Sequence, residues 1–344
     1  MKLTRFKGNP VISPNPRNKW ESLVTTNPGA WYDENKKEVF LLYRTAGEDA
    51  EHRTYFGLAS SKDGFNFDRL SDKPVFSPSF DGFDAGCVED PRVIKIGEYF
   101  FITYACRPFP PGQYWLNEKR EYKSPKFPFD FPLILRDNHT STGLAITKDF
   151  KNFIRMGRLT NAAVDNRDVI LFPEKINGKF YMMHRPMNWV GKKYGTNDPA
   201  IWISSADDLL GFPDGKILAK AKYKWEKKIG GNTPPIKTKY GWLTIYHAVG
   251  PDKYYRLGAM LLDINDPTIV LYRTTEWILQ PEEDYEINGF YKGVVFPCGK
   301  VVIGDTLFVY YGGADKYVGV ATCSLTELLE YLLKCPADRP TLTI

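Results

Sequence analysis

The sequence lacks the features that mark membrane and secreted proteins. No window approaches about 18 uninterrupted apolar residues, and Met1–Pro10 has no apolar core of a secretory signal. We therefore expect a cytoplasmic protein without a membrane partner. The 344 residues carry a formal net charge of only +5, from 46 basic and 41 acidic side chains. That small excess is scattered along the chain, so nucleic acid is not expected as a partner.

Cysteines are few, and the common cofactor motifs are missing. The five cysteines are odd in number and show no CxxC spacing. We expect free, mostly buried thiols and neither a disulfide framework nor a zinc site. No His, Cys and Asp residues have metal-ligand spacing, and no GxGxxG, GxxxxGK[ST] or GxSxG motif occurs. The sequence therefore gives no support for a metal enzyme, a nucleotide-binding enzyme or a serine hydrolase, and it predicts no cofactor.

Aromatic residues, by contrast, are abundant at 15%, which favours β-strands. Five hydrophobic strands recur at a spacing of roughly sixty residues: 39–44, 99–104, 179–185, 241–247 and 307–312. Each is followed by a second strand with a small residue near its start. Each is preceded by a strand that begins at a proline, at 27–28, 90–91, 172–173, 233–235 and 296–297. These are repeated units of short strands and turns.

Such a repeat predicts an all-β fold, a five-bladed β-propeller with a short C-terminal helix. We expect one catalytic domain over residues 1–344, with blades near 20–80, 85–160, 165–222, 230–283 and 290–323. A capping box from Ser324 to Glu327 and leucines at helical spacing predict the closing helix over 324–335. Two β-sandwiches are the alternative, but they give no reason for five matching units. The aromatic and proline-rich insertion from Arg107 to Leu133 is predicted to be an ordered loop over one face, on the acceptor side of the substrate.

In a propeller the innermost strands line a central channel, so the residues at their proline-marked beginnings converge. The predicted equivalent positions are Asn27, Asp90, Glu174, Asn232 and Phe296. Adjoining residues add Arg44, Arg53, Glu89, Arg92, Arg185, Lys228, His247 and Asp315, and Tyr246 would suit the apolar face of a sugar ring. Acids beside a group of bases are what acid-assisted transfer to or from an anion requires. Taken singly, His247 could be a core histidine, and Glu174 and Lys228 could belong to a solvated surface.

Five motifs in order resemble glycoside hydrolase family 130, the mannoside phosphorylases and β-mannosidases. They are Glu89-Asp-Pro-Arg92, Leu171-Phe-Pro-Glu-Lys-Ile-Asn-Gly-Lys179, Met183-His-Arg-Pro186, Gly241-Trp-Leu-Thr-Ile-Tyr-His247 and Tyr311-Gly-Gly-Ala-Asp315, and the resemblance runs from Asn9 to Cys323. It implies that Asp90 is the catalytic acid, acting through a sugar hydroxyl. It also implies that Arg185, Lys228 and His247 hold phosphate, and that Asn27, Arg44, Arg53 and Asp315 bind the mannosyl unit. To these sugar-binding residues we add Glu89 and Tyr246 from the convergence of the strands.

Two departures from the family pattern bear on function. Glu174 stands where some phosphorylases carry an arginine, which would remove a positive charge from the anion site and supply a base for water. Gly230-Gly231-Asn232 replaces the commoner Gly-Ala-Gly at the floor of the site.

We expect inverting phosphorolysis of β-mannosides, with β-1,2-linked manno-oligosaccharides as the expected substrates, inorganic phosphate as co-substrate and α-mannose 1-phosphate as product. An inverting exo-β-1,2-mannosidase, with Glu174 activating water opposite Asp90, stays open. So do a non-catalytic carbohydrate-binding propeller and a homo-oligomeric assembly.

Overall fold

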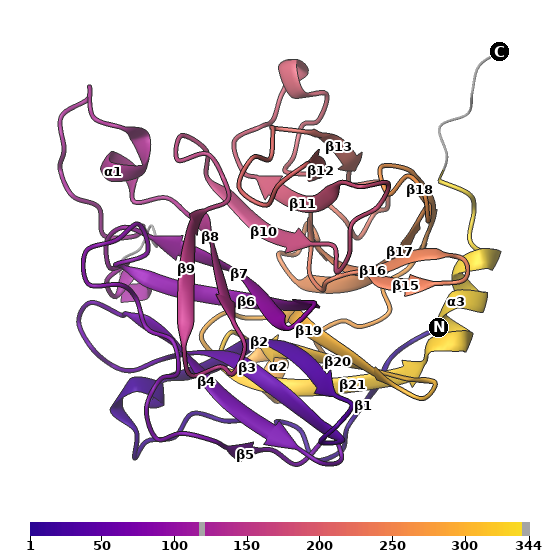
Figure 1. Cartoon of the computed structure of the whole chain (residues 1–344), viewed down its shortest axis with the longest axis horizontal. Helices are drawn as coiled ribbons and strands as arrows, with labels where there is room; N and C mark the ends of the chain where they lie inside the picture. The colour runs from indigo at the N-terminus through magenta and orange to yellow at the C-terminus, as the bar shows by residue number, and fades with distance from the viewer. Residues whose placement is uncertain (117–120, 339–344) are drawn as a thin grey trace.

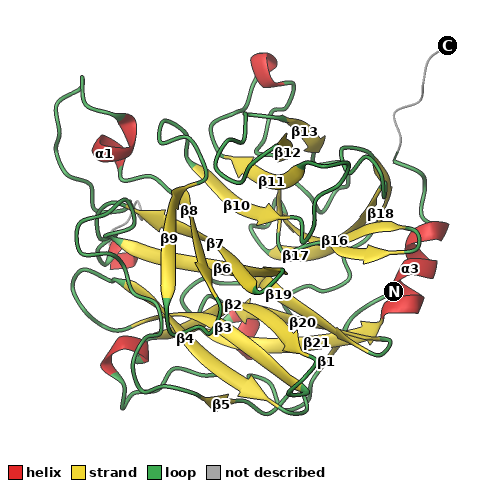
Figure 2. Cartoon of the chain, in the orientation of Figure 1, coloured by secondary structure: helices red, strands yellow, loops and turns green. Residues whose placement is uncertain are grey.

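The computed structural model of the chain describes residues 1–116 and 121–338. Within them, the strands form five antiparallel sheets, and helices are few and short (Figures 1 and 2). This confirms the five-bladed propeller predicted from the repeats. No helix of the described residues is long and apolar enough to cross a membrane.

Four blades are sheets of strands that follow one another along the chain, and the fifth also includes β1 from the N-terminus. Blade 1 comprises β2 (Val24–Asp33), β3 (Glu38–Ala46), β4 (Thr54–Ser61) and β5 (Asp68–Arg69); blade 2 comprises β6 (Cys87–Ile96), β7 (Tyr99–Arg107), β8 (Ser141–Thr147) and β9 (Phe153–Arg158). Blade 3 comprises β10 (Asn166–Leu171), β11 (Phe180–Pro186), β12 (Ile201–Ala206) and β13 (Lys216–Ala219). Blade 4 comprises β14 (Lys228–Gly231), β15 (Ile236–Thr238), β16 (Gly241–Val249), β17 (Tyr255–Leu262) and β18 (Val270–Arg273); blade 5 comprises β19 (Val295–Ile303), β20 (Thr306–Gly313), β21 (Tyr317–Ser324) and β1 (Thr4–Arg5).

The innermost strands are interrupted at equivalent places. The ladders of β2, β6 and β10 break between Thr26 and Gly29, Glu89 and Arg92, and Arg167 and Ile170. The residue after each break point has a left-handed φ: 45° at Asn27, 53° at Asp90 and 53° at Asp168. In blade 4 the break is the gap from Gly231 to Ile236, and in blade 5 it falls at Cys298. Because such bulges re-aim side chains, they turn polar residues toward one end of the channel.

This register corrects two of the five predicted equivalent positions. In blade 3 the position belongs to Asp168 and not to Glu174, because Pro173 and Glu174 follow the end of β10 at Leu171 and lie in the turn that leads to β11. In blade 5 it belongs to Cys298 and not to Phe296. The proline is therefore an imperfect marker, and the left-handed Asn or Asp is the better one.

Four blades share an internal cluster of a buried acid, a tyrosine and an arginine. The acid accepts a hydrogen bond from the tyrosine hydroxyl of the second strand and one from an arginine of the outer strand. The sets are Glu21–Tyr43–Arg69, Asp84–Tyr104–Arg155, Glu226–Tyr246–Arg273 and Glu286–Tyr311–Arg5. A glycine of the third strand makes room for each ring, since a Cβ at Gly57, Gly143, Gly258 or Gly319 would lie 2.3–2.7 Å from the tyrosine Cζ. This explains the small residue predicted near the start of each such strand.

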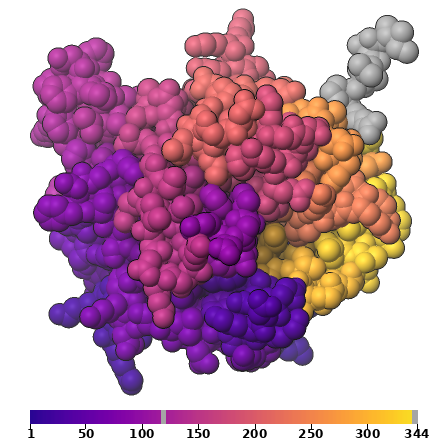
Figure 3. Space-filling view, viewed as in Figure 1, coloured from indigo at the N-terminus to yellow at the C-terminus, as the bar shows by residue number. Residues whose placement is uncertain are grey.

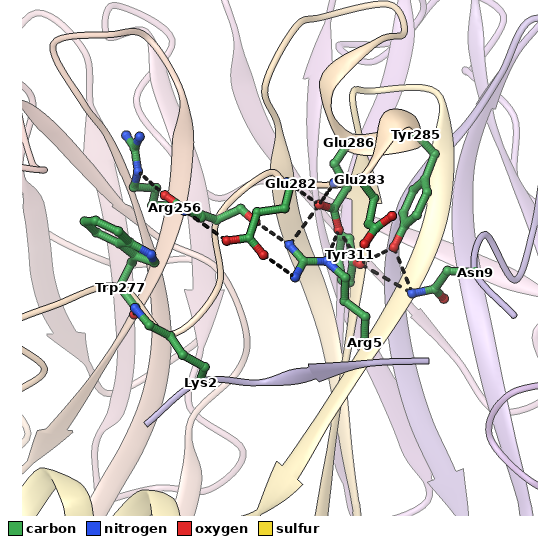
Figure 4. Close-up of polar contacts among 11 residues, drawn as sticks. Lys2, Arg5, Asn9, Arg256, Trp277, Glu282, Glu283, Tyr285, Glu286 and Tyr311 are labelled. Carbon is green, nitrogen blue, oxygen red and sulfur yellow. Dashed lines mark hydrogen bonds and ion pairs between the residues drawn. The ribbon is translucent and has the colours of Figure 1, made fainter. Parts of the chain in front are cut away.

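The last of these clusters closes the propeller, because its arginine comes from the other end of the chain. β1 pairs with β21, and Arg5 Nε and Nη2 donate to the Glu286 carboxylate at 2.8 and 2.9 Å (Figure 4). Arg5 Nη1 also donates to Glu282 at 2.9 Å, and Tyr311 donates to Glu286 at 2.7 Å. The N-terminal and C-terminal parts therefore lie side by side (Figure 3). The repeats did not predict this strand.

The predicted helix is confirmed as α3 (Leu325–Lys334). Ser324 is its N-cap and accepts from the Glu327 backbone N–H at 3.1 Å, while Leu328 and Leu332 pack into the core of blades 4 and 5. The remaining helices are η1 (Lys19–Glu21), η2 (Tyr114–Leu116), α1 (Leu133–Asp137), η3 (Lys192–Tyr194) and α2 (Asp284–Ile287). All five cysteines are free, and all but Cys323 are buried, as predicted.

Candidate active site

A cavity of about 160 Å³ opens at the end of the channel toward which the bulges turn their side chains. Every blade contributes to its wall. The lining residues are Asn27, Arg44, Glu89, Asp90, Ala105, Arg107, Tyr114, Tyr122, Thr140, Arg167, Asp168, Arg185, Tyr255, Tyr291, Val294, Phe296 and Asp315. Four carboxylates and four arginines are therefore gathered at one place. The convergence predicted from the repeat accounts for Asn27, Arg44, Glu89, Asp90, Arg185, Phe296 and Asp315.

Asp90 is held by two donors and stays partly open. Its Oδ1 accepts from Asn27 Nδ2 at 2.8 Å and from Arg44 Nη1 at 3.2 Å, while its side chain remains 18% exposed. Arg44 also pairs with Glu89 at 2.9 Å. Within the described residues, hydrogen bonds reach only Oδ1 of Asp90. The second oxygen is thus available to exchange a proton with a hydroxyl group in the cavity.

Asp315 adds another carboxylate on the same side of the cavity. Removal from water raises the pKa of Asp315 to about 6, an effect that the negative charges of Asp90 and Glu89 reinforce and the Arg44 guanidinium opposes. Both protonation states of the Asp315 carboxyl group are therefore accessible near neutral pH. The group can accept a hydrogen bond from a sugar hydroxyl or donate one to it.

The part of the wall that blade 3 carries is rich in arginine. Arg167 is fixed by two 2.8 Å hydrogen bonds to the oxygens of Asp165, and Arg185 Nη2 lies 2.9 Å from Asp168 Oδ2. Arg185 Nη1 donates to His247 Nε2 at 2.9 Å, and His247 Nδ1 is bonded to the Asn232 amide at 2.8 Å. The guanidinium groups are held in fixed orientations, which favours binding of an oxyanion between them.

Lys228 and His247 support this basic wall from behind. Neither lines the cavity. Desolvation, together with the charges of Arg185 and Arg167, lowers the pKa of Lys228 to about 7. Desolvation, together with the charges of Arg185, Lys228 and Arg92, lowers the pKa of His247 far below its usual range, so its imidazole is neutral and accepts from Arg185. His247 thus positions Arg185, whereas the sequence had suggested direct contact with phosphate.

The aromatic insertion forms the outer wall of the cavity. Tyr114 and Tyr122 line it, and the Arg107 guanidinium lies 3.8 Å from the centre of the Tyr122 ring. Around Tyr114, the rings of His52, Trp115 and Phe290 form a cluster with centroids 4.4–6.2 Å apart. Residues 117–120 of the insertion lie outside the described part of the chain. The described part of the insertion thus adds two aromatic rings to the cavity wall.

Comparison with known proteins identifies the family. The model of glycoside hydrolase family 130, described as beta-1,4-mannooligosaccharide phosphorylase, matches residues 3–119 and 135–334. This chain belongs to glycoside hydrolase family 130. It is 38% identical over 335 residues to a 1,2-beta-oligomannan phosphorylase of Thermoanaerobacter sp., covering 95% of this chain and 99% of the relative. It is 37% identical over 281 residues to a beta-1,2-mannobiose phosphorylase of Listeria innocua, covering 81% of this chain and 69% of the relative.

Solved structures agree with this family assignment. The beta-1,2-mannobiose phosphorylase from Listeria innocua, solved as a complex with beta-1,2-mannobiose, has a TM-score of 0.77 and 30% sequence identity to this chain. The match covers 97% of this chain and 99% of that one. The five-bladed arrangement is therefore that of a family 130 enzyme over nearly the whole chain.

Besides Lys228 and His247, three further residues assigned from the sequence lie outside the cavity wall. Glu174 is 48% exposed at its side chain and pairs with Lys237 at 2.5 Å, so it is not placed to act as a base opposite Asp90. Arg53 lines no part of the cavity either; it pairs with Glu51 at 2.7 Å and bonds the Ala85 carbonyl. Tyr246 is buried in the acid–tyrosine–arginine cluster of blade 4 and not beside a sugar site.

Several residues of this family 130 site were missed from the sequence. Arg167 and Asp168 precede the motif at 171–179. Arg107 is the last residue of β7, and Tyr255 is the first residue of β17. For Asp168 a signal did exist: Asn27 to Arg44 and Asp168 to Arg185 are separated by the same number of residues. For Tyr255, no repeated residue type marks the position.

Proposed function

We propose that this chain is an inverting β-mannoside phosphorylase that transfers a terminal mannosyl unit to inorganic phosphate. The observation that carries the proposal is the two-sided wall: a partly free carboxylate on blade 2 and oriented arginines on blade 3 of one cavity. A hydrolase needs a base for water, but it has no need for fixed arginines. The base that hydrolysis was expected to use, Glu174, is exposed and paired elsewhere.

In the proposed reaction, phosphate is bound by Arg167 and Arg185, and the charge of Lys228 behind them attracts it. One of its oxygens forms a bond to the anomeric carbon while the bond from that carbon to the glycosidic oxygen breaks. The proton of Asp90 passes through a sugar hydroxyl to the departing oxygen. Attack opposite the leaving group gives α-mannose 1-phosphate and a chain shorter by one mannose. Asn27, Arg44, Glu89 and Asp315 are the proposed sugar-binding residues, since they surround Asp90.

The proposed linkage is β-1,2. The family description names β-1,4-mannooligosaccharides, whereas the two relatives with 37–38% identity carry names that specify β-1,2-mannosides. We propose a cytoplasmic location, where free phosphate is present. We also propose that all five blades form one catalytic domain, because Asn27, Asp90, Arg185, Tyr255 and Phe296 bring one residue from each blade to the cavity.

The test is product analysis with β-1,2-mannobiose, β-1,2-mannotriose and β-1,4-mannobiose, each with and without phosphate. The expected result is phosphate-dependent release of α-mannose 1-phosphate from the β-1,2 substrates. Arg185→Ala should raise the KM for phosphate by about 10- to 100-fold, because it removes charge-assisted hydrogen bonds. Release of free mannose at full rate without phosphate would overturn the proposal, and a preference for β-1,4-mannobiose would overturn the linkage.

A further inference from the structure

Asp168 is a carboxylate on the side of the cavity that otherwise attracts anions. It lines the cavity, is 4% exposed, and lies between Arg92 and Arg185. Its Oδ1 accepts one hydrogen bond, from Arg92 Nη2 at 3.4 Å. Its Oδ2 lies 2.9 Å from Arg185 Nη2, yet no described residue donates a well-directed hydrogen bond to it. An ionised carboxylate can accept at four positions, so most of the acceptor capacity of Asp168 is unused.

The neighbouring carboxylate, that of Asp165, is hydrogen-bonded differently. Asp165 also belongs to blade 3 and also pairs with an arginine, but both of its oxygens accept 2.8 Å hydrogen bonds from Arg167. Asp165 is not part of the cavity wall. The two residues carry the same charge near the same arginines, and they differ in two respects: only Asp168 lines the cavity, and only Asp168 has an oxygen without a well-directed hydrogen bond from the described residues.

The backbone around Asp168 is built to hold the carboxylate where it is. Asp168 adopts φ 53°, a conformation that is unfavourable for a residue with a Cβ. On the adjacent strand, Gly230 leaves space for it, since a Cβ there would lie 2.2 Å from Asp168 Oδ2 and 2.5 Å from His247 Cε1. This accounts for one of the two glycines at the floor of the site. An unfavourable backbone conformation persists only where the surrounding structure holds it in place, so the position of this carboxylate is not incidental.

A carboxylate beside an anion site distinguishes anions that still carry a proton from anions that are fully deprotonated. Phosphate keeps at least one P–OH group at neutral pH and can donate it, whereas sulfate is fully deprotonated and would meet the carboxylate only with repulsion. We propose that Asp168 accepts a hydrogen bond from a protonated oxygen of bound phosphate and so makes the site selective for phosphate over sulfate. The same bond would leave the deprotonated oxygens facing the anomeric carbon. This inference rests on the proposed function, because it takes phosphate to bind at Arg167 and Arg185.

The experiment measures the binding of phosphate and of sulfate by isothermal titration calorimetry at neutral pH and constant ionic strength. Wild type, Asp168→Asn and the matched control Asp165→Asn are compared. Wild type should bind phosphate at least about tenfold more tightly than sulfate, the difference expected when one charge-assisted hydrogen bond is replaced by repulsion. Asp168→Asn should reduce this ratio by about tenfold, mainly through tighter sulfate binding, because an amide can donate to sulfate.

Asp165→Asn removes the same charge at a residue that lies outside the cavity wall and whose two oxygens both accept hydrogen bonds from Arg167. It should change the affinities for both anions together and leave their ratio within about twofold of wild type. Equal binding of sulfate and phosphate by wild type would overturn the inference, and so would a parallel change for both anions in Asp168→Asn. In either case phosphate-dependent cleavage would still stand. Failure of the proposed function would look different: no phosphate binding and no phosphate dependence.

Discussion

Two groups of carboxylates in this propeller share the features usually taken to mark a site. Glu21, Asp84, Glu226 and Glu286 are completely buried inside blades and pair with arginines. Glu89, Asp90, Asp168 and Asp315 line the cavity, and arginines lie beside them as well. Burial and an arginine partner therefore do not distinguish structure from function in this fold.

The difference lies in how completely the oxygens are used. Both oxygens of Glu226 accept, from the Tyr246 hydroxyl, from Arg273 and from the backbone of Lys222 and Tyr223. Asp90 and Asp168, in contrast, each keep an oxygen that receives no well-directed hydrogen bond from the described residues. Satisfied carboxylates hold the blades together, and unsatisfied ones beside a cavity are left for a ligand.

The largest expected effect is on catalysis, at Asp90. Asp90→Asn should lower kcat by about 10²- to 10⁴-fold, because an amide cannot deliver the proton to the departing oxygen. The amide can still accept from Asn27 and Arg44, so the midpoint of thermal unfolding should change little. Glu89→Gln is the control and should cost less activity, since Glu89 pairs with Arg44 without acting on the proton. If Asp90→Asn retained most of the activity, another residue would have to be the catalytic acid, and Asp315 would be the next candidate.

The second effect is on stability, at Glu226. Glu226→Ala should lower the free energy of unfolding by about 3–5 kcal/mol, because Arg273 would be left charged, buried and without its main partner. Denaturant unfolding measures the loss, and the specific activity of the folded fraction should stay close to that of wild type. Glu21→Ala is the matched control, with a smaller loss, because the side chain of Arg69 is 29% exposed and can be hydrated. A large loss of kcat with unchanged stability would remove the distinction between the two groups.

The sequence predicted the blades well because the repeat is a property of local patterning. Each blade repeats a proline-marked strand, a hydrophobic strand and a strand with a small residue, and this pattern indicates the fold class and seven of the residues that line the cavity. Tyr246 could not be assigned correctly, since a tyrosine at the end of a hydrophobic strand looks the same whether it bonds a buried acid or a sugar. The closing contact of Arg5 with Glu286 joins residues at opposite ends of the chain, and no local pattern encodes it.

The basic half of the site was only partly predictable. Glu174 was chosen because it follows a proline, but the bulge in β10 lies before that proline and presents Asp168. Arg167 carries no signal of its own in a chain with 46 basic residues. What distinguishes it is the pairing with Asp165, two residues earlier in the chain, which the sequence alone does not show.

A third effect concerns pH and Lys228. Its pKa is lowered to about 7, by desolvation first and then by Arg185 and Arg167. Below that pH the amine is charged and can attract phosphate; above it the amine is neutral. The KM for phosphate should therefore rise with pH above about 7, by no more than tenfold per pH unit for one proton.

Phosphate also titrates near neutral pH, so the control is Lys228→Arg, which stays charged throughout. The difference between the two pH profiles isolates the lysine. Identical profiles would show that Lys228 does not act on the anion.

The smallest expected effect is at Glu174, which belongs neither to the buried carboxylates of the blades nor to the carboxylates of the cavity wall. Glu174 is an acid with an exposed side chain and an exposed partner, Lys237, outside the cavity wall. Surface ion pairs of this kind contribute about 0–1 kcal/mol. Glu174→Gln should therefore change the free energy of unfolding by less than about 0.5 kcal/mol and leave phosphate-dependent turnover within about twofold of wild type. Lys237→Met, which breaks the same pair from the other side, should behave alike. Two results together would contradict this prediction: loss of cleavage in Glu174→Gln alone, and a wild-type reaction that proceeds without phosphate. Glu174 would then have to be the base of a hydrolase. Free acceptor capacity beside the cavity would no longer identify the functional acids.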